Sequence, residues 1–521
     1  MAEGAAPAPW RRALPALVAA AAVAVLAVAA LSWPYRLREP DPYAYRAATW
    51  TIEQGELTLD DAGYIAVDSA LIASGDGWTR QLVDPNPQYV AAAGPGGCPQ
   101  RRGSFTGPIF GEPPPIGITQ WVRLDDGTCV SEKSPGYPFL LAPFDSVGLV
   151  RLAPLLFGLV GFVGIWTGAR RWLGPWGACT AVGLTAAGPG VIVMAHRAWM
   201  PTFTDALLLA GGVGFVLWAV LAVERRFAHR AWVGALGCAL AGLSTTLRLT
   251  NAVPAVVLAV WAVVVGSRRR ARAGPRLIAC WLAGALVPAS ALVAYNLWVF
   301  GAPWASGYEA GGGGPQWDVG SIGPNVSAMT GRLTWALPVW WLALLAALVA
   351  GALALGRRSL APPADCGRPE ASGAGDGAVL ALLGAWWLSV WGLYAMFGWT
   401  VTNVPAGSHP MISSRFYLPA VGAVGLLAAW LLVRLPAWVG VVAIAALLVV
   451  SVTAAGAALD GDWLFSDDLA RDVPSSSSSV PPAPSVPGQP PGPVGQTPGQ
   501  PPGPVPGQAP GQGAGQGPGP P

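Results

Sequence analysis

Two short polar stretches near the start of the chain hold residue types that could carry out group transfer. The first, residues 38–47, reads REPDPYAYRA and contains the carboxylates Glu39 and Asp41. The second, residues 132–143, reads EKSPGYPFLLAP and contains Lys133. A carboxylate within hydrogen-bond reach can take a proton from an attacking hydroxyl, and a fixed cation can stabilise the charge that grows on a departing phosphate. Asp41 and Glu39 are therefore the candidate bases, with Asp41 preferred, and Lys133 is the first candidate partner for a phosphate.

Lys133 is unusual because it is the only lysine in the chain, and every other basic residue is arginine. A lysine presents a compact point charge, whereas an arginine presents a planar fork of donors. The plain alternative is that charged, Pro-rich residues only mark the water interface at the ends of membrane spans. The single lysine in an arginine-using chain weakens this alternative for Lys133 and leaves both readings open.

Further charged residues lie at the predicted outer ends of membrane spans. Arg248 and Arg415 are the next candidates for phosphate binding, and the alternative is that each snorkels to the interface. Asp205 could pair with Arg197 or His196, or lie in an acceptor site together with Arg197. His409, in the last outer loop, is a candidate substrate contact.

The elements that must position these residues are predicted to be membrane helices. The chain of 521 residues is 53% hydrophobic and only 11% charged, and its mean hydropathy is +0.48. Soluble proteins usually contain about 25% charged residues, so this composition excludes an ordinary soluble protein. The chain contains apolar blocks whose length is close to the roughly 20 residues needed to cross a bilayer. These blocks predict an all-α polytopic fold with about 11 transmembrane helices. They lie at 14–33, 147–167, 175–195, 204–223, 231–248, 252–266, 277–298, 333–355, 378–398, 416–433 and 436–458.

The arginines support one orientation of these spans. Arg11 and Arg12 precede the first span, and the pairs Arg170/Arg171 and Arg357/Arg358 fall in loops on the same predicted side. Because cytoplasmic loops are enriched in basic residues, the N-terminus (1–13) is expected in the cytoplasm of a multi-pass plasma-membrane protein. The first span is longer than a signal-peptide core and lacks a small-residue cleavage site, so an uncleaved anchor is favoured over a signal peptide. The arginine bias also suggests a GC-rich, actinobacterial source.

The orientation places a long first loop (34–146) and a C-terminal tail (459–521) outside the cytoplasm. Cys98 and Cys129 are the only cysteines in predicted outer segments, and an oxidising compartment favours a disulfide between them, contributing roughly 3–4 kcal/mol. No Cys or His spacing resembles a zinc site, so no metal site is predicted. The tail, rich in Pro, Gly and Gln, contains the octapeptide PGQPPGPV twice and is expected to be disordered.

The two polar stretches, taken with the order of the spans, resemble the GT-C glycosyltransferases. The resemblance is to the protein-mannosyltransferase/aminoarabinose-transferase-like class, including the RgtA/B/C/D-like domain. It is carried by the carboxylates after span one and by the KSPGYPFLLAP stretch that leads into span two. Weaker similarities lie at 196–205, 242–251, 295–303 and 414–419, so the resemblance covers residues 14–458. Relatives place an acidic residue where this chain has Arg38, which leaves both Asp41 and Glu39 open as the base and leaves a non-catalytic relative as an alternative.

The resemblance implies an inverting transfer of a sugar from a polyprenyl-phosphate donor to a glycan, lipid or protein acceptor of the cell envelope. It implies membrane lipid as the surroundings, no nucleic-acid partner and no cofactor, although a divalent cation assists some members of the class. Two readings from other classes compete with it. A transporter or flippase would show inverted repeats and binding groups near the membrane midplane. A non-catalytic envelope-assembly protein would use the tail as a tether.

Overall fold

The computed structural model describes residues 9–32, 40–73, 121–222, 225–269, 274–310, 317–355, 376–397 and 414–460. The chain divides into a unit of residues 1–469 and a second unit of residues 470–521, and the second lies outside the described residues. Glu39, Cys98 and His409 also lie outside them.

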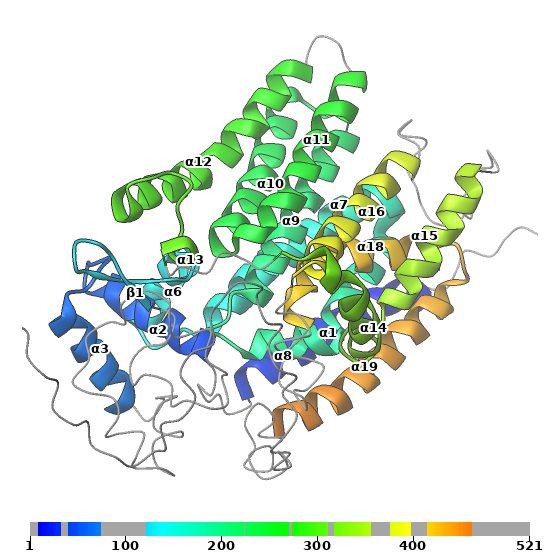
Figure 1. Ribbon diagram of the computed structural model, residues 1–521. Helices are drawn as coiled ribbons and strands as arrows, with labels where there is room; N and C mark the ends of the chain where they lie inside the picture. Colours follow the sequence, from blue (N-terminus) through cyan, green and yellow to red (C-terminus); the bar gives the residue numbers. More distant parts are fainter. Residues whose placement is uncertain are drawn as a thin grey trace, which may run out of the picture. The chain divides into compact units, whose positions relative to one another are not determined.

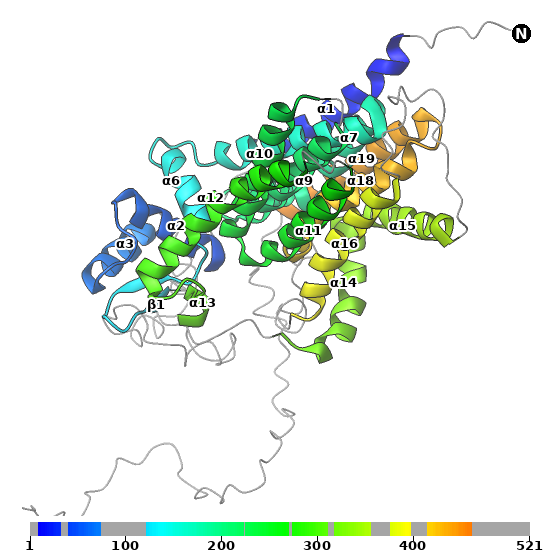
Figure 2. The same ribbon diagram turned by 90° about the horizontal axis from the view of Figure 1, so that it is seen from above.

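Long apolar helices make up most of the first unit (Figures 1 and 2). Ala-, Leu- and Val-rich sequences favour helices that satisfy every backbone hydrogen bond internally, as a bilayer requires. These helices are α1 (Pro9–Ser32), α7 (Leu152–Ala186), α8 (Pro189–His196), α9 (Thr202–Leu221), α10 (Phe227–Leu247), α11 (Ala252–Arg269), α12 (Gly274–Phe300), α14 (Ile322–Ala336), α15 (Trp340–Leu355), α16 (Asp376–Ala395), α18 (Val421–Leu432) and α19 (Ala437–Asp460).

Six of the described helices are long and apolar enough to cross a membrane, and the number is seven if the bent pair 319–336 and 340–355 is one span. Two shorter apolar helices, Leu249–Val265 and Leu418–Leu432, lie where further spans are predicted. In α7, Gly174 has a φ of +81° and divides the element into two helical segments between the predicted spans 147–167 and 175–195. The chain is thus an all-α, multi-pass membrane protein, and the number of eleven spans stays a prediction.

Glycines allow the central helices to pack at very short range. α9 is buried along almost its whole length and packs against both α7 and α10. A Cβ on Gly164 of α7 would overlap the carbonyl oxygen of Gly211 in α9, and a Cβ on Gly212 would lie 2.6 Å from the carbonyl oxygen of Gly237 in α10. Small residues at such crossings let helix backbones approach closely, as is common in membrane bundles.

The first loop contains a small folded unit beside the bundle, in which α2, α3, α6 and β1 lie together (Figures 1 and 2). Its elements are α2 (Pro40–Glu53), α3 (Asp61–Ala73), the antiparallel strands β1 (Trp121–Arg123) and β2 (Cys129–Ser131), and α6 (Gly136–Asp145). The β1–β2 pairing places Trp121 opposite Ser131. Part of the predicted first loop thus consists of regular elements that pack on one another.

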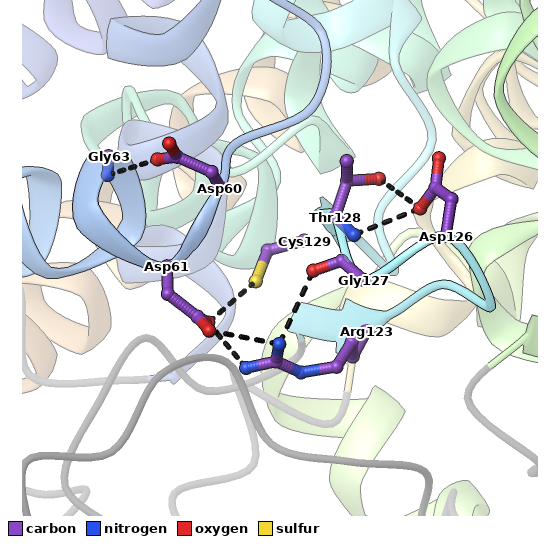
Figure 3. A network of polar contacts seen from close by, with 8 residues as sticks. All are labelled: Asp60, Asp61, Gly63, Arg123, Asp126, Gly127, Thr128 and Cys129. Carbon is purple, nitrogen blue, oxygen red and sulfur yellow. Dashed lines mark hydrogen bonds and ion pairs between the residues drawn. The ribbon is translucent and has the colours of Figure 1, made fainter.

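A polar network joins the β1–β2 hairpin to α3 (Figure 3). Arg123 of β1 forms an ion pair with Asp61, the first residue of α3, and also donates to the Gly127 carbonyl at 3.3 Å. The Sγ of Cys129, which is fully buried, lies 4.0 Å from an oxygen of the same Asp61. At the hairpin turn, the backbone N–H and hydroxyl of Thr128 donate to Asp126 and hold the pKa of that carboxyl below its usual value. The Cys98–Cys129 disulfide stays a prediction because Cys98 is not among the described residues.

Candidate functional site

Asp41 and Lys133, predicted from separate stretches, meet in an ion pair. Pro40 and Asp41 begin α2, where a proline fits the first turn and a carboxylate is favoured by the partial positive charge of the helix N-terminus. Lys133 follows β2 and precedes α6. Its Nζ donates to Oδ1 of Asp41 at 2.7 Å. The side chain of Lys133 is only 6% exposed and that of Asp41 is 18% exposed.

The surroundings of Lys133 keep its ammonium charged. Burial by itself would lower the pKa of Lys133, but the Asp41 carboxylate, together with Tyr308 and Tyr45, raises the pKa above its usual value. The ammonium also donates to the hydroxyl of Tyr308 at 3.3 Å, and it lies 5.5 Å and 5.9 Å from the ring centroids of Tyr308 and Tyr45. Aromatic faces attract a cation at such distances. The buried tyrosine beside it, Tyr45, has its own pKa raised, chiefly by burial.

Two arginines and a second carboxylate extend the Asp41–Lys133 ion pair into a cluster of five charged residues. Nη2 of Arg415 lies 3.5 Å from Oδ2 of Asp41, so the two oxygens of this carboxylate face different cations. Nε of Arg248, just after α10, lies 2.7 Å from Oδ2 of Asp205, whose side chain is completely buried in the first turn of α9. Arg248 also donates to the backbone carbonyl of Arg415 at 3.0 Å and to the hydroxyl of Thr202 at 2.7 Å. The Arg248–Asp205 pair is thereby linked to the Asp41 site.

The five charged residues of this cluster have a formal net charge of +1, because three cations face two carboxylates. Among the described residues, no group of three or more His, Cys, Asp and Glu side chains could hold a metal ion. Both described carboxylates already lie against cations. The excess of one positive charge among these five residues suits an anionic group.

Aromatic contacts hold the start of α2 against the bundle. The guanidinium of Arg46 lies 4.8 Å from the ring centroid of Trp50 and 5.5 Å from that of Trp199, in the turn between α8 and α9. Tyr137 of α6 donates to the carbonyl of Ala198 in the same turn. Arg46 lies one and a half helical turns beyond Asp41, so these contacts fix the carboxylate relative to the bundle.

The structure brings Asp41, Lys133, Arg248, Arg415 and Asp205 together. The predicted partners of Asp205 were Arg197 or His196, whereas the structure pairs it with Arg248, because the end of α10 packs beside the start of α9. Nδ1 of His196 lies 3.4 Å from Nη2 of Arg151. Arg197 directly follows α8.

Tyr308 is a site residue that the sequence reasoning did not find. It lies in α13 (Gly307–Ala310), 175 residues after Lys133 and outside every quoted motif. The sequence shows only that a glycine precedes Tyr308, and the structure gives the reason: a Cβ on Gly307 would lie 2.5 Å from the Cα of Glu132. A glycine beside a tyrosine after a span is compatible with close approach of two backbones.

The apolar helices and this cluster at their ends define a class: a multi-pass membrane protein with a cationic polar site built around one carboxylate. No family model matches the chain, and no curated protein matches it.

The chain is similar to ArnT from Cupriavidus metallidurans, solved in the apo state and bound to undecaprenyl phosphate, at TM-scores of 0.42 and 0.43 and 17% identity in both cases. These matches cover 81% and 82% of this chain and 60% and 62% of ArnT. It is also similar to the Archaeoglobus fulgidus oligosaccharyltransferase, solved in complex with Zn and sulfate, at a TM-score of 0.43 and 12% identity, over 85% of this chain and 53% of that one.

The chain thus spans between 53% and 62% of the length of these solved structures.

Proposed function

We propose that this protein is an integral membrane glycosyltransferase that moves a sugar from a polyprenyl-phosphate donor to a cell-envelope acceptor on the extracytoplasmic face. The observation that carries the proposal is the position of Asp41, one oxygen of which lies 2.7 Å from Lys133 Nζ and the other 3.5 Å from Arg415 Nη2. A carboxylate beside two fixed cations provides a base and an anion site in one place. The motif resemblance supplies the substrate class.

The donor phosphate is the anion that the cluster would receive. Lys133 and Arg415 would each turn from Asp41 toward the phosphate oxygens, since a phosphate offers more charge and more acceptor atoms than one carboxylate. Tyr308, already 3.3 Å from Lys133 Nζ, can keep the ammonium oriented during this exchange. Arg248 holds the backbone carbonyl of Arg415 and so positions that segment.

When Lys133 and Arg415 turn to the phosphate, the Asp41 carboxylate gains affinity for a proton and so becomes a better base. The acceptor hydroxyl gives its proton to the Asp41 carboxylate while its oxygen bonds to the anomeric carbon. The bond from that carbon to the phosphate oxygen breaks, and its electron pair leaves with the phosphate, whose added charge is stabilised by Lys133 and Arg415. Attack on the face opposite the phosphate inverts the anomeric configuration.

The place of the charges distinguishes this proposal from a transporter. Asp41 begins α2, Asp205 lies in the first turn of α9, and Arg248 follows the last residue of α10. A transporter site is expected near the membrane midplane, where broken helices meet. Charges gathered at helix ends instead favour chemistry at the surface of the bilayer.

The test is a transfer assay with the purified full-length protein and a panel of labelled polyprenyl-phosphate sugars, with a cell-envelope extract as acceptor. The wild type should transfer label from one donor, and Asp41→Asn should lower this rate at least a hundredfold, which is the lower range for loss of a general base. Asp126→Asn is the matched control, because Asp126 is an exposed hairpin-turn residue away from the cluster. Equal transfer by Asp41→Asn and wild type would refute the assignment of the base.

A further inference from the structure

The aromatic ring of Tyr394 contacts the segment that carries Arg415, which lies in the short helix η5 (Ser414–Phe416). Tyr394 is buried at the C-terminal end of α16. Its ring centroid lies 5.2 Å from that of Phe416 and 6.0 Å from that of Tyr417, the two residues that follow Arg415. The guanidinium of Arg415 in turn lies 4.9 Å from the ring centroid of Phe416. A shift of the Tyr394 ring would therefore be transmitted to Arg415 through Phe416.

The hydroxyl of Tyr394 reaches Arg248, the residue that holds the backbone of Arg415. Oη of Tyr394 lies 2.6 Å from Oγ1 of Thr250, and it also forms a hydrogen bond with the side chain of Arg248. A guanidinium can only donate, so Tyr394 accepts from Arg248 and can give its own hydrogen to Thr250. Arg248 donates to the Arg415 carbonyl at 3.0 Å. Tyr394 thus acts on the Arg415 segment in two ways, by its ring and through Arg248.

Two other residues of α16 hold the chain that follows Arg415. Trp386 donates from Nε1 to the carbonyl of Pro419 at 3.0 Å, and the ring centroid of Trp391 lies 5.5 Å from that of Tyr417. The segment after Arg415 is therefore packed on α16 by polar and aromatic contacts. Tyr394 differs from these two tryptophans because it also hydrogen-bonds to the buried Arg248 network.

We infer that Tyr394 is a positioning residue that sets the place of the Arg415 guanidinium for the donor phosphate. The inference rests on the proposed function and adds a residue that acts through Arg415. Loss of the Tyr394 hydroxyl removes an acceptor from Arg248, and the Arg415 carbonyl that Arg248 holds can then shift. Asp41 is fixed separately, by the contacts of α2 with the bundle. The affinity for the donor should therefore fall, while the chemical step is retained.

The first test measures the donor KM and the transfer rate at saturating donor for the full-length protein. The probe is the labelled polyprenyl-phosphate sugar that the wild type transfers. Tyr394→Phe keeps the ring and removes the hydroxyl, so it should raise this KM about threefold to tenfold, the usual effect of one hydrogen bond. The rate at saturating donor should change less than about twofold. A merely structural role would instead lower the rate through loss of folded protein and leave the KM unchanged.

Tyr64→Phe is the matched control for loss of a buried tyrosine hydroxyl. Tyr64 lies in α3, where its ring contacts Trp121 in the core of the loop unit. The donor KM of this variant should equal that of the wild type. An equal rise of the KM in both tyrosine variants would overturn the role of Tyr394.

A double-mutant cycle tests whether Tyr394 acts through Arg415. The Kd of undecaprenyl phosphate, which carries no sugar, is measured for the wild type, Tyr394→Phe, Arg415→Gln and the double variant. Arg415→Gln should weaken binding at least tenfold, and Tyr394→Phe should have no further effect in that background. Equal weakening by Tyr394→Phe with and without the Arg415 side chain would overturn the inference while the proposed function still holds. Failure of the wild type to transfer sugar from any donor would instead overturn the proposed function, and the inference with it.

Discussion

Burial separates the two carboxylates of the cluster into different roles. The side chain of Asp205 has no exposed surface and lies 2.7 Å from Arg248, whereas Asp41 keeps 18% of its side chain exposed. A buried charge is tolerated only when it is paired, so Asp205 fixes Arg248 in place. Asp41 can reach a substrate, since part of it already faces the outside of the fold. We therefore expect Asp205 to have a structural role, and the greater exposure of Asp41 supports its proposed role in chemistry.

Removal of one member of the buried Asp205–Arg248 pair should destabilise the protein more than removal of both members. Arg248→Met leaves Asp205 buried without its cation and should lower the free energy of unfolding by about 3–5 kcal/mol. The double variant Asp205→Leu/Arg248→Met removes the uncompensated charge and should be more stable than Arg248→Met alone. Thermal unfolding of the proteins in one detergent measures both. A double variant that is less stable than the single one would show that the pair contributes net stability by itself.

The elements position the site through very close helix packing. α7, α9 and α10 approach one another where glycines face backbone atoms, as at Gly164 opposite Gly211. These helices carry Asp205 at the start of α9 and Arg248 at the end of α10, so any shift between them moves the cluster. The aromatic contacts of Arg46 with Trp50 and Trp199 then tie α2 to the same helices.

A methyl group at the α7–α9 contact should force these helices apart. Gly164→Ala places a Cβ against the Gly211 carbonyl oxygen and should destabilise the protein by roughly 1–3 kcal/mol, as overpacking does. Gly384→Ala, in α16, is the matched control, because nothing lies within 4 Å of its Cβ. The control should be neutral or more stable by about 0.5–1 kcal/mol, since alanine favours a helix. Unfolding temperatures of the two variants check this, and equal values would contradict the packing argument.

For the molecule as a whole, hydropathy predicts where the chain is helical, because the bilayer constrains each span locally. Asp41 and Lys133 each stand out within their own stretch of sequence, and the structure joins them in an ion pair, while their roles stay predictions. Contacts between distant segments could not be predicted. Tyr308 reaches Lys133 across 175 residues, and Asp205 pairs with Arg248 rather than with its neighbours in sequence. The helix α2 and the β1–β2 hairpin lie within the predicted first loop, and neither was predicted from the sequence.

Asp41 is proposed to act in the chemical step, and Lys133 is proposed to hold the donor phosphate. The most direct measurement is donor affinity and single-turnover transfer rate together, for the wild type, Asp41→Asn and Lys133→Met. Asp41→Asn removes an anion that competes with the phosphate for Lys133 and Arg415, so it should bind the donor at least as tightly as the wild type. Its transfer rate should nevertheless fall by about 10²–10⁴. Lys133→Met should weaken donor binding at least tenfold, the loss of one charge-assisted contact. Transfer by Asp41→Asn at the wild-type rate, or unchanged donor affinity in Lys133→Met, would contradict the account.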